Sequence, residues 1–363
     1  MADFIHTLPV APALRALIRG EAAAWPEEVD VAALVNHGIA PLLYARLPYP
    51  ALRDVALQAA AAEPLRLDDL RALLDAFARQ GIRALIIKGT ALAYDVYEAP
   101  ELRPRADTDL LIDRADVERV RALLASLGYE ARLLSGDPHA NRQQAFARLD
   151  RFNVEHVYDV HWDIANTPIV RDALRFDELL ARAMALPRIG PAAIAPSPVD
   201  ALLLACIHRV AHHHDSDRLI WLCDIHLLRE RMVPGEHEEF WRRAAERRVV
   251  AICERSIELA DQWFGRAPHD HALDWLRGAD IAGDEPSAAF LDRRRTRAAA
   301  LAADLKALGW RARLERLRDL ALPPPAFMRA SFPAAPRAAL PWLYLYRGAR
   351  GVWRLLHRVD AGG

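Results

Sequence analysis

Apolar residues recur along the first half of the chain with spacings that predict a helix followed by a strand. Between residues 64 and 80 they fall three or four positions apart, which is typical of a helix with one buried face: Leu67, Leu70, Leu74 and Phe77. Gly81 marks the end of this helix. The next run, 82–87, has the length and the β-branched content of a buried strand. We therefore expect the helix to cover a sheet that contains this strand.

The alternation of helices and strands continues to residue 164. A strand is predicted over 108–112, and the helix after it has one apolar face and ends before Gly128. Further strands are predicted over 129–134, 145–150 and 154–164. This order of elements predicts an α+β protein in which a small mixed sheet is flanked by helices.

The second half of the chain has helical periodicity throughout. Three prolines and a glycine within nine residues predict a linker at 190–198. Helices are predicted after it over four ranges: 199–214, 217–232, 238–264 and 295–320. We therefore expect four parts in chain order, namely an N-terminal helical segment (1–61), a sheet-containing domain (62–190), an all-helical domain (197–320) and an aromatic, basic tail (321–363).

The predicted strand 82–87 ends at a candidate phosphate site, Lys88-Gly89-Thr90. Glycine allows the backbone to turn sharply and to approach a ligand closely, and the N–H groups that open the next helix can bind an anion together with the Thr90 hydroxyl. Lys88 is one of only two lysines in the chain, whereas the other basic residues are arginines. A compact ammonium at this position suits a phosphate ligand.

Asp107 and Asp109 lie at the start of the strand predicted over 108–112, where positions i and i+2 point to the same face. Two carboxylates about 5 Å apart repel each other by on the order of 3 kcal/mol at an effective dielectric constant near 20. A bound cation relieves this repulsion, and Mg²⁺ prefers such oxygen ligands and leaves positions open for phosphates. Two Mg²⁺ ions would suit an in-line phosphoryl displacement.

The strand predicted over 154–164 alternates between polar and apolar residues. One face carries Asp159 and His161, and the opposite face is apolar. Asp159 is a candidate third carboxylate for the site and could take the proton from an attacking hydroxyl. His161 would lie beside it and face the substrate cleft, where it could orient a ligand or contact the acceptor. The alternative is that both side chains form the solvated face of an edge strand.

Three segments together carry a family resemblance: KGTALAYDVY, LRPRADTDLLID and YDVHWDI. The chain resembles a largely uncharacterised bacterial nucleotidyltransferase family with the pattern K-G-x-x-L, R-x-x-x-D-x-D-L-L-[IV] and [DE]-x-H-W, and more broadly the nucleotidyltransferase fold of the DNA polymerase β superfamily. The gap between Thr90 and Asp107 is longer than in most of that superfamily but suits the narrower family.

The resemblance implies a transfer of a nucleoside monophosphate from a nucleoside triphosphate to an acceptor, with release of pyrophosphate. It implies that three acids bind the metals and that four residues bind the nucleotide: Asp107, Asp109 and Asp159, and Lys88, Gly89, Thr90 and Arg103. It also implies that residues of the two helices after the linker face the substrate cleft, namely His208, His212 and Asp224.

Composition narrows the class of partner. The chain has 48 basic and 49 acidic side chains, and this balance disfavours a long nucleic acid as substrate. The three cysteines are widely spaced in apolar contexts, which is typical of buried thiols in a reducing compartment. No apolar run is long enough for a membrane span, so a cytoplasmic location is expected.

Two other functions are compatible with the sequence. The chain could be a catalytically inactive module that binds a nucleotide or a partner protein. It could instead be a helical metal phosphohydrolase, because His208, His212 and Asp215 share one helical stripe. The aromatic and basic tail is expected to pack on the helical domain, although 342–358 could also contact a membrane surface or a partner.

Overall fold

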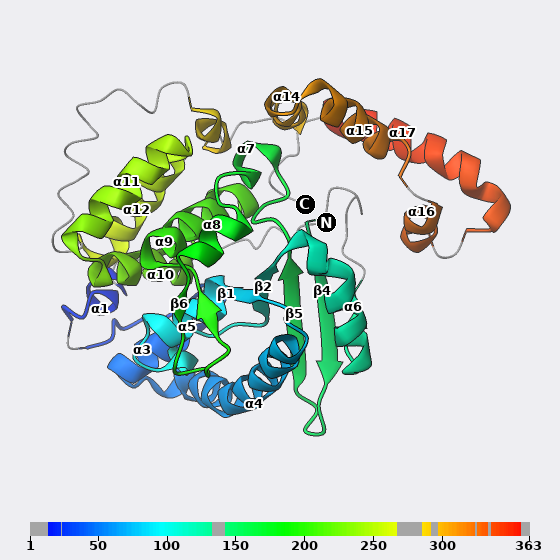
Figure 1. Ribbon diagram of the computed structural model, residues 1–363. Coiled ribbons are helices and arrows are strands. Elements are labelled where there is room, and N and C mark those ends of the chain that lie inside the picture. Colours follow the sequence, from blue (N-terminus) through cyan, green and yellow to red (C-terminus); the bar gives the residue numbers. More distant parts are fainter. Residues whose placement is uncertain are drawn as a thin grey trace.

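The computed structural model describes residues 14–22, 24–132, 142–266, 285–291, 297–323, 325–332 and 335–356. At its centre is a seven-stranded mixed sheet with the order β3-β4-β5-β2-β1-β7-β6 (Figure 1). The strands are β1 (Ala84–Ile87), β2 (Thr108–Ile112), β3 (Glu130–Ala131), β4 (Gln143–Leu149), β5 (Glu155–His161), β6 (Met184–Ala185) and β7 (Ile194–Ala195). Since helices cover both faces of this sheet, the α+β prediction is confirmed.

One face of the sheet packs against α4 (Arg53–Arg79) and α6 (Val117–Ser126). Apolar side chains of both helices meet the side chains of Ile86, Leu110 and Val160 in one buried cluster. Helix α4 begins at residue 53 and therefore runs through residue 61, where the sequence predicted a boundary between the N-terminal segment and the sheet-containing domain.

The opposite face packs against the helical half of the chain. Leu85, Ile87 and Leu111 alternate with the residues named above, as expected for strands, and belong to a second buried cluster. This cluster includes residues of the helices that follow the sheet: α9 (Pro198–Ile207), α10 (Leu219–Arg231), α11 (Pro234–Glu246) and α12 (Val250–Phe264). It also includes residues of the N-terminal helices α1 (Leu14–Ile18) and α3 (Ala40–Arg46), with α2 (Val31–Asn36) between them.

Several predicted elements differ from the observed ones. The stretch 190–198 contains β7, where Ile194 pairs with Leu85 in a parallel register, so this proline-rich segment extends the sheet. The helix predicted over 238–264 is divided into α11 and α12, because Arg248 has a positive φ of 56° at the turn between them. The helix predicted over 295–320 is likewise divided at Gly309.

The last part of the chain forms an arm of helices that projects from the body (Figure 1). The arm consists of α14 (Arg297–Ala307), α15 (Trp310–Ala321), α16 (Pro325–Ser331) and α17 (Leu340–Leu356). Among the described residues, none of the helices combines the length and apolar character needed to cross a membrane. Positions 133–134 of the predicted strand 129–134, and positions 357–358 of the tail, lie outside the described residues.

The remaining helices are short and connect the larger elements. They are α5 (Lys88–Asp95), α7 (Pro168–Arg171), α8 (Phe176–Ala181), the 3₁₀ turns at 50–52, 100–102, 114–116, 286–290 and 337–339, and a π-helical turn at His208–His212. Helix α5 follows β1 directly, and the π-helical turn continues α9 without a break. These two connections supply much of the site described next.

Candidate active site

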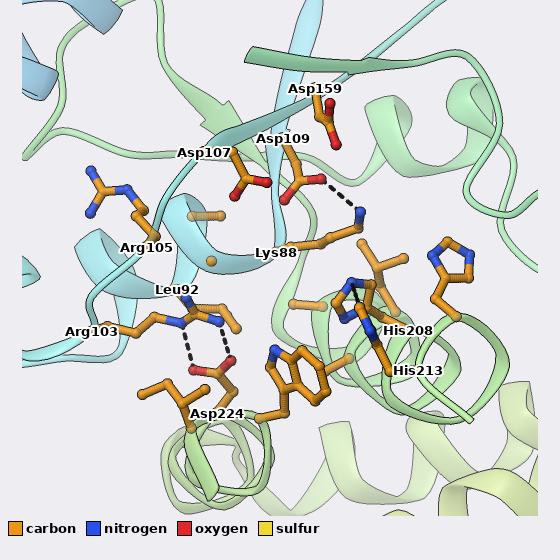
Figure 2. Close-up of a pocket in the computed structure, with 18 of the residues that line it drawn as sticks. Lys88, Leu92, Arg103, Arg105, Asp107, Asp109, Asp159, His208, His213 and Asp224 are labelled. Atoms are coloured by element: carbon orange, nitrogen blue, oxygen red, sulfur yellow. Dashed lines mark hydrogen bonds and ion pairs between the residues drawn. The ribbon is translucent and has the colours of Figure 1, made fainter. Parts of the chain in front are cut away.

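The sheet brings the candidate acids together at one edge of a cavity. Strands β2 and β5 are parallel neighbours, and their register pairs Asp109 with Asp159. Residues paired in this way point to the same face of a sheet, so the two carboxylates lie side by side. Asp107 lies two positions before Asp109 and joins them in Figure 2. Fifty residues of sequence separate Asp109 from Asp159, and the strand pairing closes that distance.

Lys88 lies directly against these acids. Its Nζ donates a hydrogen bond of 2.7 Å to Oδ1 of Asp109 and lies 3.2 Å from Nε2 of His161. The same His161 nitrogen is 2.8 Å from Oδ1 of Asp109. Lys88 has a φ of 53°, in the left-handed region that non-glycine residues rarely adopt. Such backbone strain is often found at functional sites, and here it coincides with the abrupt change from β1 to α5.

Within the described part of the chain, three groups lie close enough together to hold one metal ion. Ligand atoms of Asp109, Asp159 and His161 are all within 4.8 Å of one another. The sequence predicted Asp107, Asp109 and Asp159 as the metal ligands. The structure adds His161, which is buried against Asp109 and does not line the cleft as expected.

The pKa shifts show that these carboxylates interact. Solvent reaches Asp107 through the cavity. The cavity walls nevertheless displace much of the water around its carboxylate, and this loss of hydration and the charges of Asp109 and Asp159 raise the pKa of Asp107 to about 6. Burial and the neighbouring Asp109 also raise the pKa of Asp159. Burial alone would raise the pKa of Asp109 too, but Lys88 and His161 outweigh it and hold that pKa well below its usual range. Burial and Lys88 lower the pKa of His161.

The turn glycine has a different role from the one predicted. The positive φ falls on Lys88, and Gly89 instead makes room for the side chain of Arg103. A Cβ atom at position 89 would lie 2.4 Å from Nη1 of Arg103, which is far inside van der Waals contact. The close approach of this guanidinium, and not the turn itself, requires glycine here.

Arg103 connects the loop that precedes β2 to the helical half of the protein. Its Nε and Nη2 donate hydrogen bonds of 2.8 and 2.6 Å to the two carboxylate oxygens of Asp224 on α10 (Figure 2). The Tyr97 hydroxyl donates a third, of 2.8 Å, to the same carboxylate. Arg103 and Asp224, predicted to contact nucleotide and substrate respectively, both line the cavity but are bonded to each other.

Two further loop and helix residues are held by protein contacts. Arg105, two positions after Arg103 in the same loop, has a buried side chain that makes two hydrogen bonds, of 2.8 and 2.6 Å, to Glu63 of α4. Glu63 also accepts a hydrogen bond from Tyr94.

Thr90 was predicted to bind triphosphate, but it is buried and its hydroxyl donates to that of Thr108. Thr90 thus joins α5 to β2 and is not part of the cavity wall.

The cavity between the sheet and the helical half has a volume of about 690 Å³. The acids and Lys88 form one side, and the end of α9 with its π-helical turn forms another (Figure 2). His208 and His212, which were predicted to face the substrate cleft, line that wall. Burial and the nearby Lys88 lower the pKa of both histidines far below the ordinary value, so both are neutral at pH 7.

Sequence reasoning missed several residues of the cavity wall. His213 lies 3.1 Å from His208 through their Nε2 atoms and packs on Trp221, with 4.1 Å between ring centroids. Gln143 of β4 approaches Asp159, with 3.4 Å between Nε2 and Oδ2. The triple histidine at 212–214 was a visible signal for His213, but nothing local to Gln143 or Trp221 indicates the cavity.

The phosphohydrolase alternative lacks its aspartate. Asp215 is buried and its carboxylate pairs with Arg209 and Arg255, at 2.8 and 3.2 Å. Its backbone φ of 56° also takes it out of the helical stripe on which the prediction depended. The structure therefore does not bring His208, His212 and Asp215 together as a metal site.

The comparison with known families agrees with this geometry. The sequence profile described as "Uncharacterised nucleotidyltransferase" matches residues 23–265. The chain belongs to this nucleotidyltransferase family. The matched region contains every element of the cavity wall, from β1 to α10, and ends before the arm. No curated protein matches the chain, so membership of the nucleotidyltransferase family supports the general activity and leaves the substrates to be inferred from the site.

Proposed function

We propose that this nucleotidyltransferase family member is a Mg²⁺-dependent enzyme. It transfers a nucleoside monophosphate from a nucleoside triphosphate to an acceptor hydroxyl or similar nucleophile of a small molecule, peptide or protein, and it releases pyrophosphate. The observation that carries the proposal is the side-by-side placement of Asp109 and Asp159, with Asp107 next to them, on the wall of a cavity of about 690 Å³. A cavity of this size can hold a nucleotide and a small acceptor group together.

The donor set suits a divalent cation. Asp107, Asp109 and Asp159 offer carboxylate oxygens, which Mg²⁺ prefers, and their mutual repulsion supports a cation between them. His161 adds a nitrogen within the same group, a ligand that Mn²⁺ also accepts. When bound, the metal would polarise the phosphate oxygens and balance the charge of the pyrophosphate leaving group.

The protein residues would position the reactants. Lys88 is the cation closest to the acids, and its side chain reaches from the first residue of α5, so it can neutralise a triphosphate at the helix N-terminus. Asp159 can accept the proton of an acceptor hydroxyl, because it lines the cavity beside Asp109. The neutral His208 and His212 face the same cavity and offer hydrogen bonds to an acceptor.

Pyrophosphate release from labelled nucleoside triphosphates, in the presence of Mg²⁺ and candidate acceptors, tests the proposal. Asp109→Asn should abolish turnover, because the variant loses both the charge and one metal ligand. Asp113→Asn is the matched control: Asp113 is exposed, ends the same strand and caps the 3₁₀ turn that follows, away from the cavity. Tight binding of nucleotide without turnover by the unmodified protein would contradict the proposal and favour a binding module.

A further inference from the structure

The helical arm exposes apolar side chains to an unusual degree. Twelve large apolar side chains are exposed among the described residues, and seven of them lie between positions 310 and 346. The seven are Trp310, Leu314, Leu317, Leu322, Trp342, Leu345 and Tyr346. The other five are dispersed over the body, as single exposed apolar residues normally are. The concentration on one arm therefore indicates a contact surface.

Helix geometry arranges these side chains in stripes. On α15, Trp310, Leu314 and Leu317 occupy positions i, i+4 and i+7, which lie on one face. On α17, Trp342, Leu345 and Tyr346 do the same at i, i+3 and i+4, with exposed fractions of 73, 65 and 54%.

A different face of α17 contacts the segment that precedes α16. The Tyr344 hydroxyl donates a hydrogen bond of 2.5 Å to the carbonyl of Pro323, just before α16. The Tyr346 ring meets the ring of Phe332, just after α16, edge to face, with 6.2 Å between centroids. Even so, more than half of each side chain in the stripe of Trp342, Leu345 and Tyr346 is exposed to solvent.

The arm is also strongly basic. Between residues 310 and 356 the sequence has nine arginines and only two acidic residues, whereas the whole chain has a net charge of −1. The remainder of the chain consequently has an acidic surplus. Arg311, Arg313 and Arg350 are exposed beside the apolar stripes. Arginines and aromatic residues interleaved on an exposed helix are characteristic of binding to an anionic interface.

We infer that the arm docks on an anionic lipid surface, with the aromatic side chains of α15 and α17 in the headgroup layer and the arginines against lipid phosphates. Trp and Tyr have an apolar body and a polar tip, which suits this layer. The arm stands away from the body, so the body does not cover it and a broad fluid surface can reach it (Figure 1).

The arm is connected to the rim of the cavity. The Thr167 hydroxyl, which lines the cavity, donates a hydrogen bond of 2.7 Å to Asp304 of α14. A docked arm would therefore hold the cavity near the lipid surface. The docking itself does not depend on the proposed nucleotidyl transfer, and its test requires no substrate.

Co-sedimentation of the full chain with vesicles tests the inference. We expect binding to vesicles of equal parts phosphatidylcholine and phosphatidylglycerol, on the order of tenfold stronger than to phosphatidylcholine alone. Salt at ~0.5 M should weaken it, because this shortens the Debye length. Trp342→Ser with Tyr346→Ser, and separately Arg311→Glu with Arg350→Glu, should each reduce binding by on the order of tenfold.

Matched controls separate the arm from general surface effects. Phe152→Ser removes an exposed aromatic residue of the body, and Arg53→Glu reverses an exposed charge at the start of α4. Neither substitution should change lipid binding. These positions are exposed, so the variants should fold. Equal binding to both kinds of vesicle, or full binding by the arm variants, would overturn the inference. Self-association without lipid that the arm variants abolish would also overturn it, because the surface would then join two copies of the chain.

Discussion

Asp224→Asn tests how strongly one buried ion pair holds the two halves of the site together. The side chains of Arg103 and Asp224 are only 8 and 4% exposed, and two short hydrogen bonds join them. Removing one partner of such a pair leaves the other charge buried and uncompensated, which costs about 3–5 kcal/mol. Asparagine keeps the shape and one acceptor oxygen, so we expect about 3 kcal/mol, at the lower end of this range.

Thermal unfolding followed by circular dichroism measures the loss. A change of 1 kcal/mol shifts the melting temperature by about 2 °C in a chain of this size, so Asp224→Asn should melt about 6 °C lower. Asp177→Asn is the matched control, because its partner Arg175 and Asp177 itself are exposed, and it should melt like the unmodified protein. A fall of less than about 2 °C for Asp224→Asn would refute the argument that desolvation makes this pair important.

Three further substitutions test the local geometry. Gly89→Ala should destabilise the protein by about 1–3 kcal/mol through its clash with Arg103. If the clash is the cause, the same substitution should lower the melting temperature less in an Arg103→Met background, measured against Arg103→Met alone, than it does in the unmodified chain. Lys88→Met should bind Mn²⁺ several-fold more tightly, by about 1 kcal/mol or more, because the ammonium no longer competes for Asp109. Calorimetry measures this affinity, and an unchanged value would exclude the competition. Thr90→Val should lower stability by about 1 kcal/mol and leave the KM for nucleoside triphosphate unchanged, whereas a raised KM would show that the hydroxyl binds triphosphate after all.

The sequence predicted the parts of the site that depend on local patterns. Asp107 and Asp109 at the start of an apolar strand, and Asp159 within an alternating one, identify acids on strand faces without any knowledge of the fold. Their position on a common face depends on the parallel pairing of β2 with β5, which the sequence did not specify. The family resemblance was what placed them together before the structure did.

Long-range contacts account for what sequence reasoning missed. Arg103 and Asp224 are 121 residues apart, and no spacing rule relates a loop arginine to an acid on a helix of the other half. Glu63 lies on α4, where an acidic residue normally faces solvent, and the approach of Arg105 and Tyr94 explains its burial. Gly89 was singled out for its backbone freedom, whereas in the structure the space beside it is filled by Arg103.

The pairing between β2 and β5 also determines where residues can be inserted without disturbing the site. The separation of the carboxylates on Asp109 and Asp159 depends on backbone hydrogen bonds between adjacent strands, and not on the length of the segment that joins them. The tip of the β4–β5 hairpin, at 150–154, lies at the far end of β5 from His161. An insertion there would enlarge the protein's surface while the geometry at the acids stayed constant, so this tip is a place where a tag or a label can be introduced.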